Sequence, residues 1–424
     1  MFKVISGVWA LLLGVVFIML GNGMHFTLIG LRGGLEGFSS TQLAIVTSGY
    51  FLGFLAGARL TPKMIRRVGH VRVFAALGSF MSAALIAFPV VTDPWVWTIL
   101  RILIGFCMSG IYVTAESWLN DASPNETRGK VLAAYMIAQT IGIIGAQGLL
   151  TLGDAGTSVL FICASILVSV AFGPILLSVT TTPVAEVTRP MPLRTLFTGS
   201  PLGTVGIFFL GAVYAIQSGM AAVFGTQIGM SANNVALLVA MLFGGALLMQ
   251  YPVGWLSDRM DRRKLIFGSA VLGAVASYLG WFSGNDLVAL LGAAFFAGGI
   301  TTPLYALFLA YTNDYLSAQD MPAASGSLIF TFGLGAILGP LATGWAMEMF
   351  GPSGFWIVLG SLFAIIATYA LYRMTRRDVT PVAETDSYLG VLPTTSVVAV
   401  EAAGSWAAEN AEAKDENENP KLTP

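Results

Sequence analysis

Two ionisable residues stand inside long apolar stretches of the chain, where an uncompensated charge is costly. Arg101 and Glu116 are the first and last residues of "RILIGFCMSGIYVTAE". On a helix they share one face with Gly105, Met108 and Tyr112, along about 22 Å. The planar guanidinium of an arginine suits a carboxylate group, and a carboxyl group inside an apolar helix can relay protons. We therefore predict that Arg101 binds a ligand and that Glu116 takes up and releases a proton.

Each of these residues also has a structural interpretation. Arg101 could form an internal ion pair or hold backbone carbonyl groups, and Glu116 could form an ion pair with Arg66 or Arg67. Histidine titrates near neutral pH, so His25 could join Glu116 in a proton-coupling group. A hydrogen-bonded structural histidine is the alternative at that position. These alternatives stay open at the level of the sequence.

Uncharged polar side chains within the apolar stretches complete a predicted solute site. Tyr112, Gln139, Gln217 and Tyr305 carry the hydroxyl and amide groups that orient ligands in apolar pockets. The glutamines could equally bridge helices through hydrogen bonds. Tyr112 and Tyr305 lie 193 residues apart, at equivalent positions of an internal repeat. That equivalence also permits a scaffold or gate role for the two tyrosines.

A dense cluster of charges interrupts the apolar sequence at "GWLSDRMDRRK", Gly254 to Lys264. Apolar stretches flank it, so these charges belong in a turn that remains in water. We predict that Asp258 accepts hydrogen bonds from a helix N-terminus near Arg128, where the helix dipole is positive, and that Arg262 pairs with Asp314. Such contacts would latch a cytoplasmic gate. The predicted gate residues are Arg66, Arg67, Asp121, Gly254, Asp258, Arg259, Arg262, Arg263 and Asp314.

The composition excludes several classes of protein. Of the 424 residues, 56% are hydrophobic and 10% are charged, whereas soluble proteins carry about 25% charged residues. A formal net charge of −1 provides no basic field for nucleic acid. The sequence contains no phosphate-binding loop, nucleotide fingerprint or metalloprotease motif, and Cys107 and Cys163 lie alone in apolar runs. We therefore predict no enzymatic activity, no cofactor and no metal site.

Apolar segments must position all of these side chains. The length of each segment is close to the roughly 20 residues that a helix needs to cross a bilayer. We identify twelve: 5–30, 41–60, 71–91, 95–118, 129–151, 156–178, 201–226, 233–256, 265–283, 286–312, 325–349 and 354–374. With the N-terminus inside, fifteen lysines and arginines near segment ends face the cytoplasm, and Arg32 alone faces outward. We predict an integral protein of the bacterial inner (plasma) membrane with both termini in the cytoplasm.

An internal repeat relates the two halves of the chain. "GFCMSGIYVTAESWLND" aligns with "GGITTPLYALFLAYTND" 193 residues later. Six segments in each half run in the same sense, as in parallel-repeat transporters. We predict an all-α membrane protein whose twelve transmembrane helices form two six-helix bundles, residues 1–178 and 201–374. A cytoplasmic linker occupies 179–200, and the acidic cytoplasmic tail at 375–424 is predicted to be disordered.

The charge cluster resembles the cytoplasmic-loop signature G-x-x-x-D-R-x-G-R-R of the major facilitator superfamily, with Asp261 in place of the second glycine. "RILIG" is similar to that family's fourth-helix motif, and the resemblance spans residues 5–374. "ESWLND", "RGKVLAAYM", "PLYALFLAYTND" and "GAILGPLATG" further resemble the YcaD-like branch, whose substrate is unknown. The resemblance implies that the loop acid closes the cytoplasmic side by docking on the other bundle. In the first half Arg66 stands where the acid is expected and Pro62 where the first glycine is expected, so only Asp258 can do so.

These observations predict a secondary active transporter that moves a small organic solute across the inner membrane by alternating access, coupled to protons. Arg101 would favour an anionic solute, and its alignment with Ala294 in the second half favours a role in function over one in folding. The alternative is a membrane sensor or assembly subunit that keeps the transporter fold without transport. A passive channel is disfavoured, because such repeats build alternating gates. The expected partners are the solute, protons and the lipid bilayer.

Overall fold

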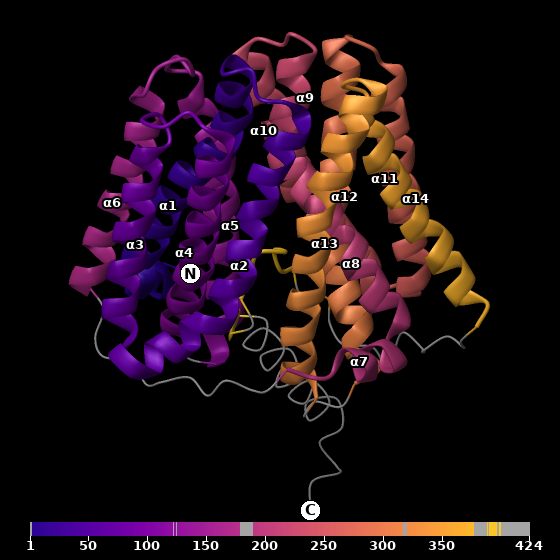
Figure 1. The fold of residues 1–424 in the computed structure, drawn as a ribbon. Coiled ribbons are helices and arrows are strands. Elements are labelled where there is room, and N and C mark those ends of the chain that lie inside the picture. The colour runs from indigo at the N-terminus through magenta and orange to yellow at the C-terminus, as the bar shows by residue number, and fades with distance from the viewer. Residues whose placement is uncertain are drawn as a thin grey trace, which may run out of the picture.

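The computed structural model describes residues 2–121, 123, 125–178, 190–316, 320–376, 388, 390–396 and 398–399. All regular structure within these ranges is helical (Figure 1). The first half contains α1 (Phe2–Leu35), α2 (Ser40–Val68), α3 (His70–Ala87), α4 (Pro94–Asp121), α5 (Asn125–Leu150) and α6 (Val159–Ser178). The second half contains α7 (Leu193–Gly199), α8 (Pro201–Ala215), the π-helical turn η1 (Ile216–Met220), α9 (Ala221–Gln227), α10 (Ala232–Ser257), α11 (Arg262–Phe282), α12 (Leu287–Asn313), α13 (Met321–Phe350) and α14 (Gly354–Met374).

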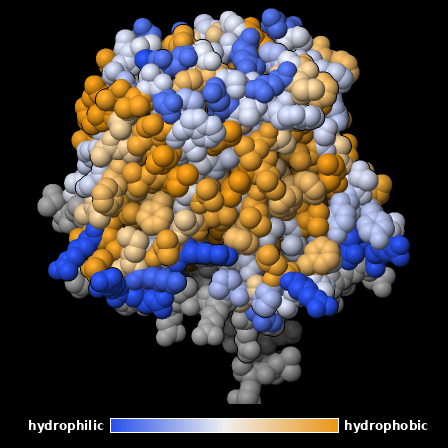
Figure 2. Space-filling view, viewed as in Figure 1, coloured by the Kyte–Doolittle hydropathy of each residue, from blue (hydrophilic) through white to orange (hydrophobic). Residues whose placement is uncertain are grey.

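Eleven of the twelve predicted segments form helices that are long and apolar enough to cross a bilayer, within the described part of the chain. One of them, Pro201–Gln227, runs continuously through α8, η1 and α9. The remaining segment forms α6, whose described apolar stretch, Val159–Pro174, is shorter than the others. Figure 2 shows the corresponding band of apolar side chains across the middle of the face in view.

Side-chain caps set several of the helix starts. Ser39 accepts a hydrogen bond from the Gln42 N–H while the Gln42 side chain accepts one from Ser39 N–H, a reciprocal capping box at α2. Asp286 caps α12 by accepting from the N–H groups of Val288 and Ala289. Such caps satisfy backbone donors that have no partner within the helix, and so fix where each helix begins.

The helices form two bundles with matching internal contacts, as the repeat predicts. Within the first bundle α1 packs on α5, and α2 packs on α4; in the second, α8 packs on α13, and α10 packs on α12. Gly105 faces the backbone of Tyr50, and its repeat equivalent Gly298 faces the backbone of Leu242. A β-carbon at either glycine would collide with the facing carbonyl oxygen. Glycine therefore permits the same close helix contact in both halves.

The two bundles meet at one end of the molecule and diverge at the other (Figure 1). We call the diverging end the basic face, because it carries the side chains of Lys63, Arg66, Arg67 and Arg259. At the opposite face, Gln227 donates a hydrogen bond to the Ser40 hydroxyl at 2.5 Å. The Thr41 N–H there donates to Glu348 Oε1 at 3.1 Å. These contacts join α2 of the first bundle to α9 and α13 of the second.

A segment from beyond α14 lies between the bundles. It comprises Tyr388 and residues 390–396, which we call the tail segment, and its trace is yellow in Figure 1. Residues 391 and 393–396 are buried. The structure thus differs here from the disorder predicted for 375–424, because the run "YLGVLPTTSVV" carries apolar side chains that the acidic composition of the rest of the tail obscures. Linker residues 179–189 and most of 377–424 lie outside the described residues.

Candidate functional site

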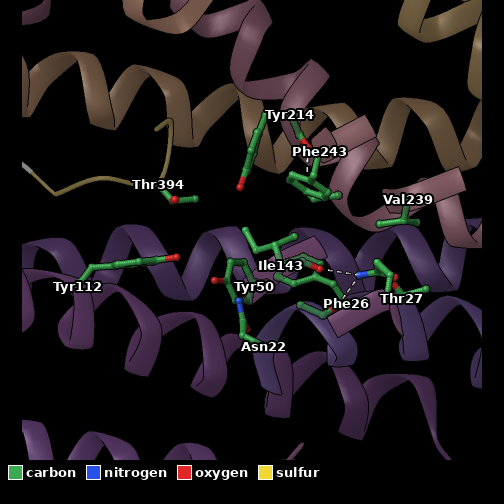
Figure 3. A pocket seen from close by; sticks show the side chains of 13 residues that line it. Asn22, Phe26, Thr27, Tyr50, Tyr112, Ile143, Tyr214, Val239, Phe243 and Thr394 are labelled. Carbon is green, nitrogen blue, oxygen red and sulfur yellow. Dashed lines mark hydrogen bonds between the residues drawn. The ribbon is translucent and has the colours of Figure 1, made fainter. Parts of the chain in front are cut away.

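A cavity lies between the bundles, and side chains from both of them line it (Figure 3). The first bundle contributes Asn22, Gly23, Phe26, Thr27, Tyr50, Tyr112, Ile143 and Gln147, and the second contributes Tyr214, Ser218, Val239 and Phe243. Thr394 of the tail segment completes the lining. The free volume is about 30 Å³, which is room for about two water molecules.

The cavity wall is uncharged and rich in tyrosine. None of its thirteen lining residues is an acid, a base or a histidine. Tyr50, Tyr112 and Tyr214 present phenol groups, and the Thr27 hydroxyl donates a hydrogen bond to Gln147 Oε1 at 2.9 Å. The buried Oδ1 atom of Asn22 has no hydrogen-bond partner among the described residues. Aromatic faces beside a few polar groups are the usual composition of a small-molecule site.

Arg101 lies behind this wall and does not line it. Its guanidinium carbon is 4.1 Å from the centre of the Phe26 ring and 4.8 Å from that of Tyr50. Nη1 is 3.1 Å from Nδ1 of His25, which the guanidinium can donate to when His25 is neutral. The Arg101 side chain is 1% exposed. In this structure Arg101 is therefore not a lining residue of the cavity, and the rings of Phe26 and Tyr50, which do line it, cover the guanidinium.

His25 belongs to the same buried cluster as Arg101. It is fully buried, and its ring centre lies 4.5 Å from that of Phe88 and 6.0 Å from that of Phe161, both edge to face. No contact joins His25 to Glu116 among the hydrogen bonds of the described residues. The structure therefore groups His25 with Arg101 in the interior of the first bundle, an arrangement that agrees with the alternative of a hydrogen-bonded structural histidine.

Glu116 sits near the end of α4 on the side of the basic face and is fully buried. Tyr135 of α5 donates its hydroxyl to Oε1 at 2.8 Å, and the backbone N–H of Ser396 donates to Oε2 at 2.8 Å. The alternative pairing with Arg66 or Arg67 is not formed, because both arginines are exposed at the end of α2 while the carboxyl group faces α5 and the tail segment. Glu116 lies one turn from Tyr112 on the same face of α4, so it borders the cavity region.

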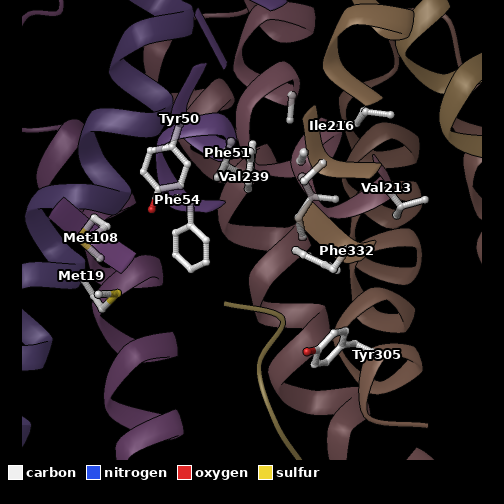
Figure 4. Close-up of a cluster of buried hydrophobic side chains, with 14 of the residues drawn as sticks. Met19, Tyr50, Phe51, Phe54, Met108, Val213, Ile216, Val239, Tyr305 and Phe332 are labelled. Carbon is white, nitrogen blue, oxygen red and sulfur yellow. The ribbon is translucent and has the colours of Figure 1, made fainter. Parts of the chain in front are cut away.

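The other four residues that were predicted to contact solute lie in different parts of the structure. Tyr112 lines the cavity, and its hydroxyl lies 3.4 Å from the Met19 sulfur. Gln217 lines a smaller pocket in the second bundle beside Tyr214 and donates to the Ala297 carbonyl at 3.1 Å. Gln139 is fully buried with both amide atoms unpartnered among the described residues. The hydroxyl of Tyr305 has no hydrogen-bond partner among the described residues and points into the space between the bundles (Figure 4).

One of the contacts predicted for the gate residues is present in the structure. Arg262 Nη1 lies 2.5 Å from Asp314 Oδ1, so the predicted pair is present, and both side chains are 3% exposed. The pair joins α11 to α12 within the second bundle, however, so it is a contact of that bundle and not a latch between bundles. Arg263 pairs with Asp261 at 3.0 Å. Arg259 donates to the Trp255 carbonyl at 3.0 Å.

Asp258 has a different partner from the one predicted. Its Oδ1 accepts a hydrogen bond from the Tyr388 backbone N–H at 2.9 Å, and no bond to it from the helix N-terminus near Arg128 is present among the described residues. The bundles diverge at the basic face, and the tail segment fills the distance between them. Gly254 accommodates the Tyr388 ring, since a β-carbon on it would lie 2.7 Å from the ring. The side chain of Asp121, another predicted gate residue, lies outside the described side chains.

Sequence reasoning missed three lining residues that now stand out: Tyr50, Tyr214 and Thr394. Tyr50 and Tyr214 are single tyrosines within apolar helices and have no equivalent in the repeat, so no pattern distinguished them from core residues. Thr394 was overlooked because it belongs to the tail. The available signal was the short apolar run around it, which interrupts an otherwise polar and acidic sequence.

Comparison with known proteins identifies the family that shares this architecture. The family model of the Major Facilitator Superfamily matches twice, at residues 11–214 and 202–406. The Uncharacterized MFS-type transporter YcaD of Escherichia fergusonii is 26% identical over 388 residues, 89% of this chain and 98% of its own. The Uncharacterized MFS-type transporter YfkF of Bacillus subtilis is 24% identical over 336 residues, 78% of this chain and 85% of its own.

Solved structures show the same fold at low sequence identity. The nucleoside transporter NupG aligns with a TM-score of 0.69 at 14% identity and covers 88% of this chain and 100% of its own. A D-xylose-proton symporter aligns with a TM-score of 0.68 at 15% identity, over 86% of this chain and 96% of its own. With two bundles, matching internal contacts and both halves matched by the family model, the chain belongs to the major facilitator superfamily.

Proposed function

We propose that this protein is a secondary active transporter that carries a small, uncharged solute bearing hydroxyl or amide groups. The observation that carries the proposal is the cavity between the bundles, whose wall holds three tyrosines and no ionic side chain. An anionic solute, which Arg101 suggested, would find no cation in this wall. Two of the structural neighbours carry a nucleoside and D-xylose, which are solutes of the uncharged polar kind.

The proposed orientation places the basic face and both termini in the cytoplasm of a bacterium, with the protein in the inner membrane. The support is the distribution of positive charge, since fifteen lysines and arginines near segment ends fall on that side in the sequence and Arg32 alone falls on the other. In this orientation the cavity is closed toward the outside by the contacts of Ser40 and Thr41. Rocking of the two bundles about the cavity would then alternate its access.

Proton coupling is assigned to Glu116. This carboxyl group is buried and lies one turn from Tyr112 of the cavity wall, with Tyr135 as a hydrogen-bond donor. Its equivalent in the second half, Leu309, cannot titrate. A buried carboxyl group beside a solute path is placed to take up a proton from one side of the membrane and release it on the other.

The first test is a ligand screen by thermal unfolding of the purified full-length protein. Nucleosides and pentoses should include a compound that raises the melting temperature, because a ligand that binds only the folded state stabilises it. Monocarboxylates should have no effect. Stabilisation by carboxylates alone would overturn the proposed solute class and would support a role for Arg101 in binding solute.

The second test uses the stabilising compound and a matched pair of variants. Tyr112→Phe and Tyr214→Phe should each weaken its binding about 3- to 10-fold through loss of one hydrogen bond. Tyr278→Phe is the control, since Tyr278 lies on α11 beside Ser361 and outside the cavity wall. Equal effects at all three tyrosines would show that the cavity is not the binding site. Binding without uptake into proteoliposomes would support the sensor alternative.

A further inference from the structure

The tail segment forms hydrogen bonds to one carboxylate group in each bundle. The Ser396 N–H donates to Glu116 of the first bundle at 2.8 Å, and the Tyr388 N–H donates to Asp258 at the end of α10 in the second bundle at 2.9 Å. Both donors are backbone amides. Hydrogen bonds from amide groups to carboxylates are stronger than those between neutral groups, so the two bundles hold the segment at two anchored points.

Between these anchors residues 391 and 393–396 are buried, whereas Gly390 is exposed. The exposed fraction is 1% for Val391, 1% for Thr395 and 8% for Thr394. Near the second anchor, a β-carbon on Gly390 would lie 2.6 Å from Nε2 of Gln250 on α10. Burial of this extent shows that Val391, Thr394 and Thr395 lie in the protein interior and not in solvent.

Thr394 places the segment inside the cavity itself. Its side chain faces the phenol groups of Tyr112 and Tyr214, one from each bundle (Figure 3). With Thr394 in the cavity wall, about 30 Å³ remains free. A solute the size of a pentose cannot fit in that volume.

We propose that the tail segment is an intramolecular plug, which occupies the solute cavity from the basic face and excludes solute while it is bound. The inference rests on the proposed function only in treating this cavity as the solute path. Residues 377–387 tether the segment to α14, and a short tether gives an effective concentration on the order of mM. A solute must therefore compete with a high local concentration of plug, and anything that withdraws the tail would activate transport.

A labelling experiment on the full chain tests this without a solute. Cys107 and Cys163 are replaced by alanine, and Ile143→Cys introduces a reporter in the cavity wall. Ser396→Pro removes the backbone N–H that donates to Glu116, whereas Ser396→Ala keeps it. Labelling of the reporter by N-ethylmaleimide should be about ten-fold faster with Ser396→Pro than with Ser396→Ala, as expected for one lost hydrogen bond to a carboxylate.

A cross-link provides the complementary test on the same background. Cysteines replacing Gly390 and Gln250 should form a disulfide, because the β-carbon of residue 390 lies 3.4 Å from Cγ of Gln250. Oxidation should then protect a reporter at position 143 from labelling, and reduction should restore access. Equal labelling in the two Ser396 variants, or no cross-link at this pair, would overturn the plug. Since neither readout involves solute, failure here leaves the proposed transport function standing.

Discussion

In each half of the molecule a glycine lets two helices pack backbone to backbone, yet the ionisable groups within α4 have no counterpart in α12. Gly105 faces Tyr50 as Gly298 faces Leu242. Arg101 and Glu116 of α4, in contrast, align with Ala294 and Leu309 of α12. The repeat therefore preserves the helix contacts that build a bundle and leaves the buried charges free to differ. Substitution of a glycine shared by the halves should therefore have the same effect in both, whereas substitution of a charged residue found in one half has no matching effect in the other.

The largest effect should come from the buried ion pair of the second half. Arg262→Ala leaves Asp314 without that partner at a position only 3% exposed. Breaking a buried pair by removing one partner costs about 3–5 kcal/mol, so we expect a comparable loss in the free energy of unfolding. Arg263→Ala, which removes a local pair with Asp261 two residues away, should cost less. A loss below that of Arg263→Ala would show that the pair does not support the bundle.

The shared glycines give the next largest effect, and it should be similar in both halves. Gly105→Ala and Gly298→Ala each place a β-carbon against a facing backbone carbonyl. Overpacking of this kind costs about 1–3 kcal/mol. Gly148→Ala and Gly292→Ala are the controls, because a β-carbon there would meet nothing within 4 Å. Thermal unfolding of the four variants measures these losses of stability. A loss in only one half would contradict the expected similarity between the halves.

Replacement of Arg101, which has no charged equivalent in the second half, should have a smaller effect on stability. Arg101→Met should lower the free energy of unfolding by about 2 kcal/mol, through loss of the stacking on Phe26 and Tyr50. The exposed Arg59, which stacks on Phe330 at 4.3 Å, provides the control. Arg59→Met should cost only about 0.5 kcal/mol. If Arg101→Met leaves stability unchanged without ligand and abolishes binding, Arg101 is a solute contact after all.

Gly254 should give the smallest change in stability. Gly254→Ala places a β-carbon 2.7 Å from the Tyr388 ring, so it should displace the tail segment while leaving the bundles intact. We expect a change in the free energy of unfolding below about 1 kcal/mol. Access of N-ethylmaleimide to the Ile143→Cys reporter should nevertheless increase. Unchanged access in a stable variant would show that the ring can move aside without releasing the segment.

The sequence predicted the architecture well because its signals can be read along the chain. Segment length and charge at segment ends depend on neighbouring residues and indicated the helices, and the repeat indicated the two bundles. The arrangement of side chains between helices is not local. Helical spacing placed Arg101 on the face of Tyr112, but it could not show that Phe26 from α1 and Tyr50 from α2 cover the guanidinium. The partner of Asp258 likewise came from a segment 130 residues later.

Uptake into proteoliposomes tests the central claim most directly, namely that the uncharged cavity carries solute and that Glu116 couples its movement to protons. A radiolabelled nucleoside or pentose that stabilises the protein is supplied with and without a pH gradient, to the native chain and to Glu116→Gln. We expect the gradient to drive accumulation in the native chain, and Glu116→Gln to retain exchange of solute without accumulation. Gradient-driven accumulation at the native rate by Glu116→Gln, or accumulation of anionic solutes alone, would contradict the account.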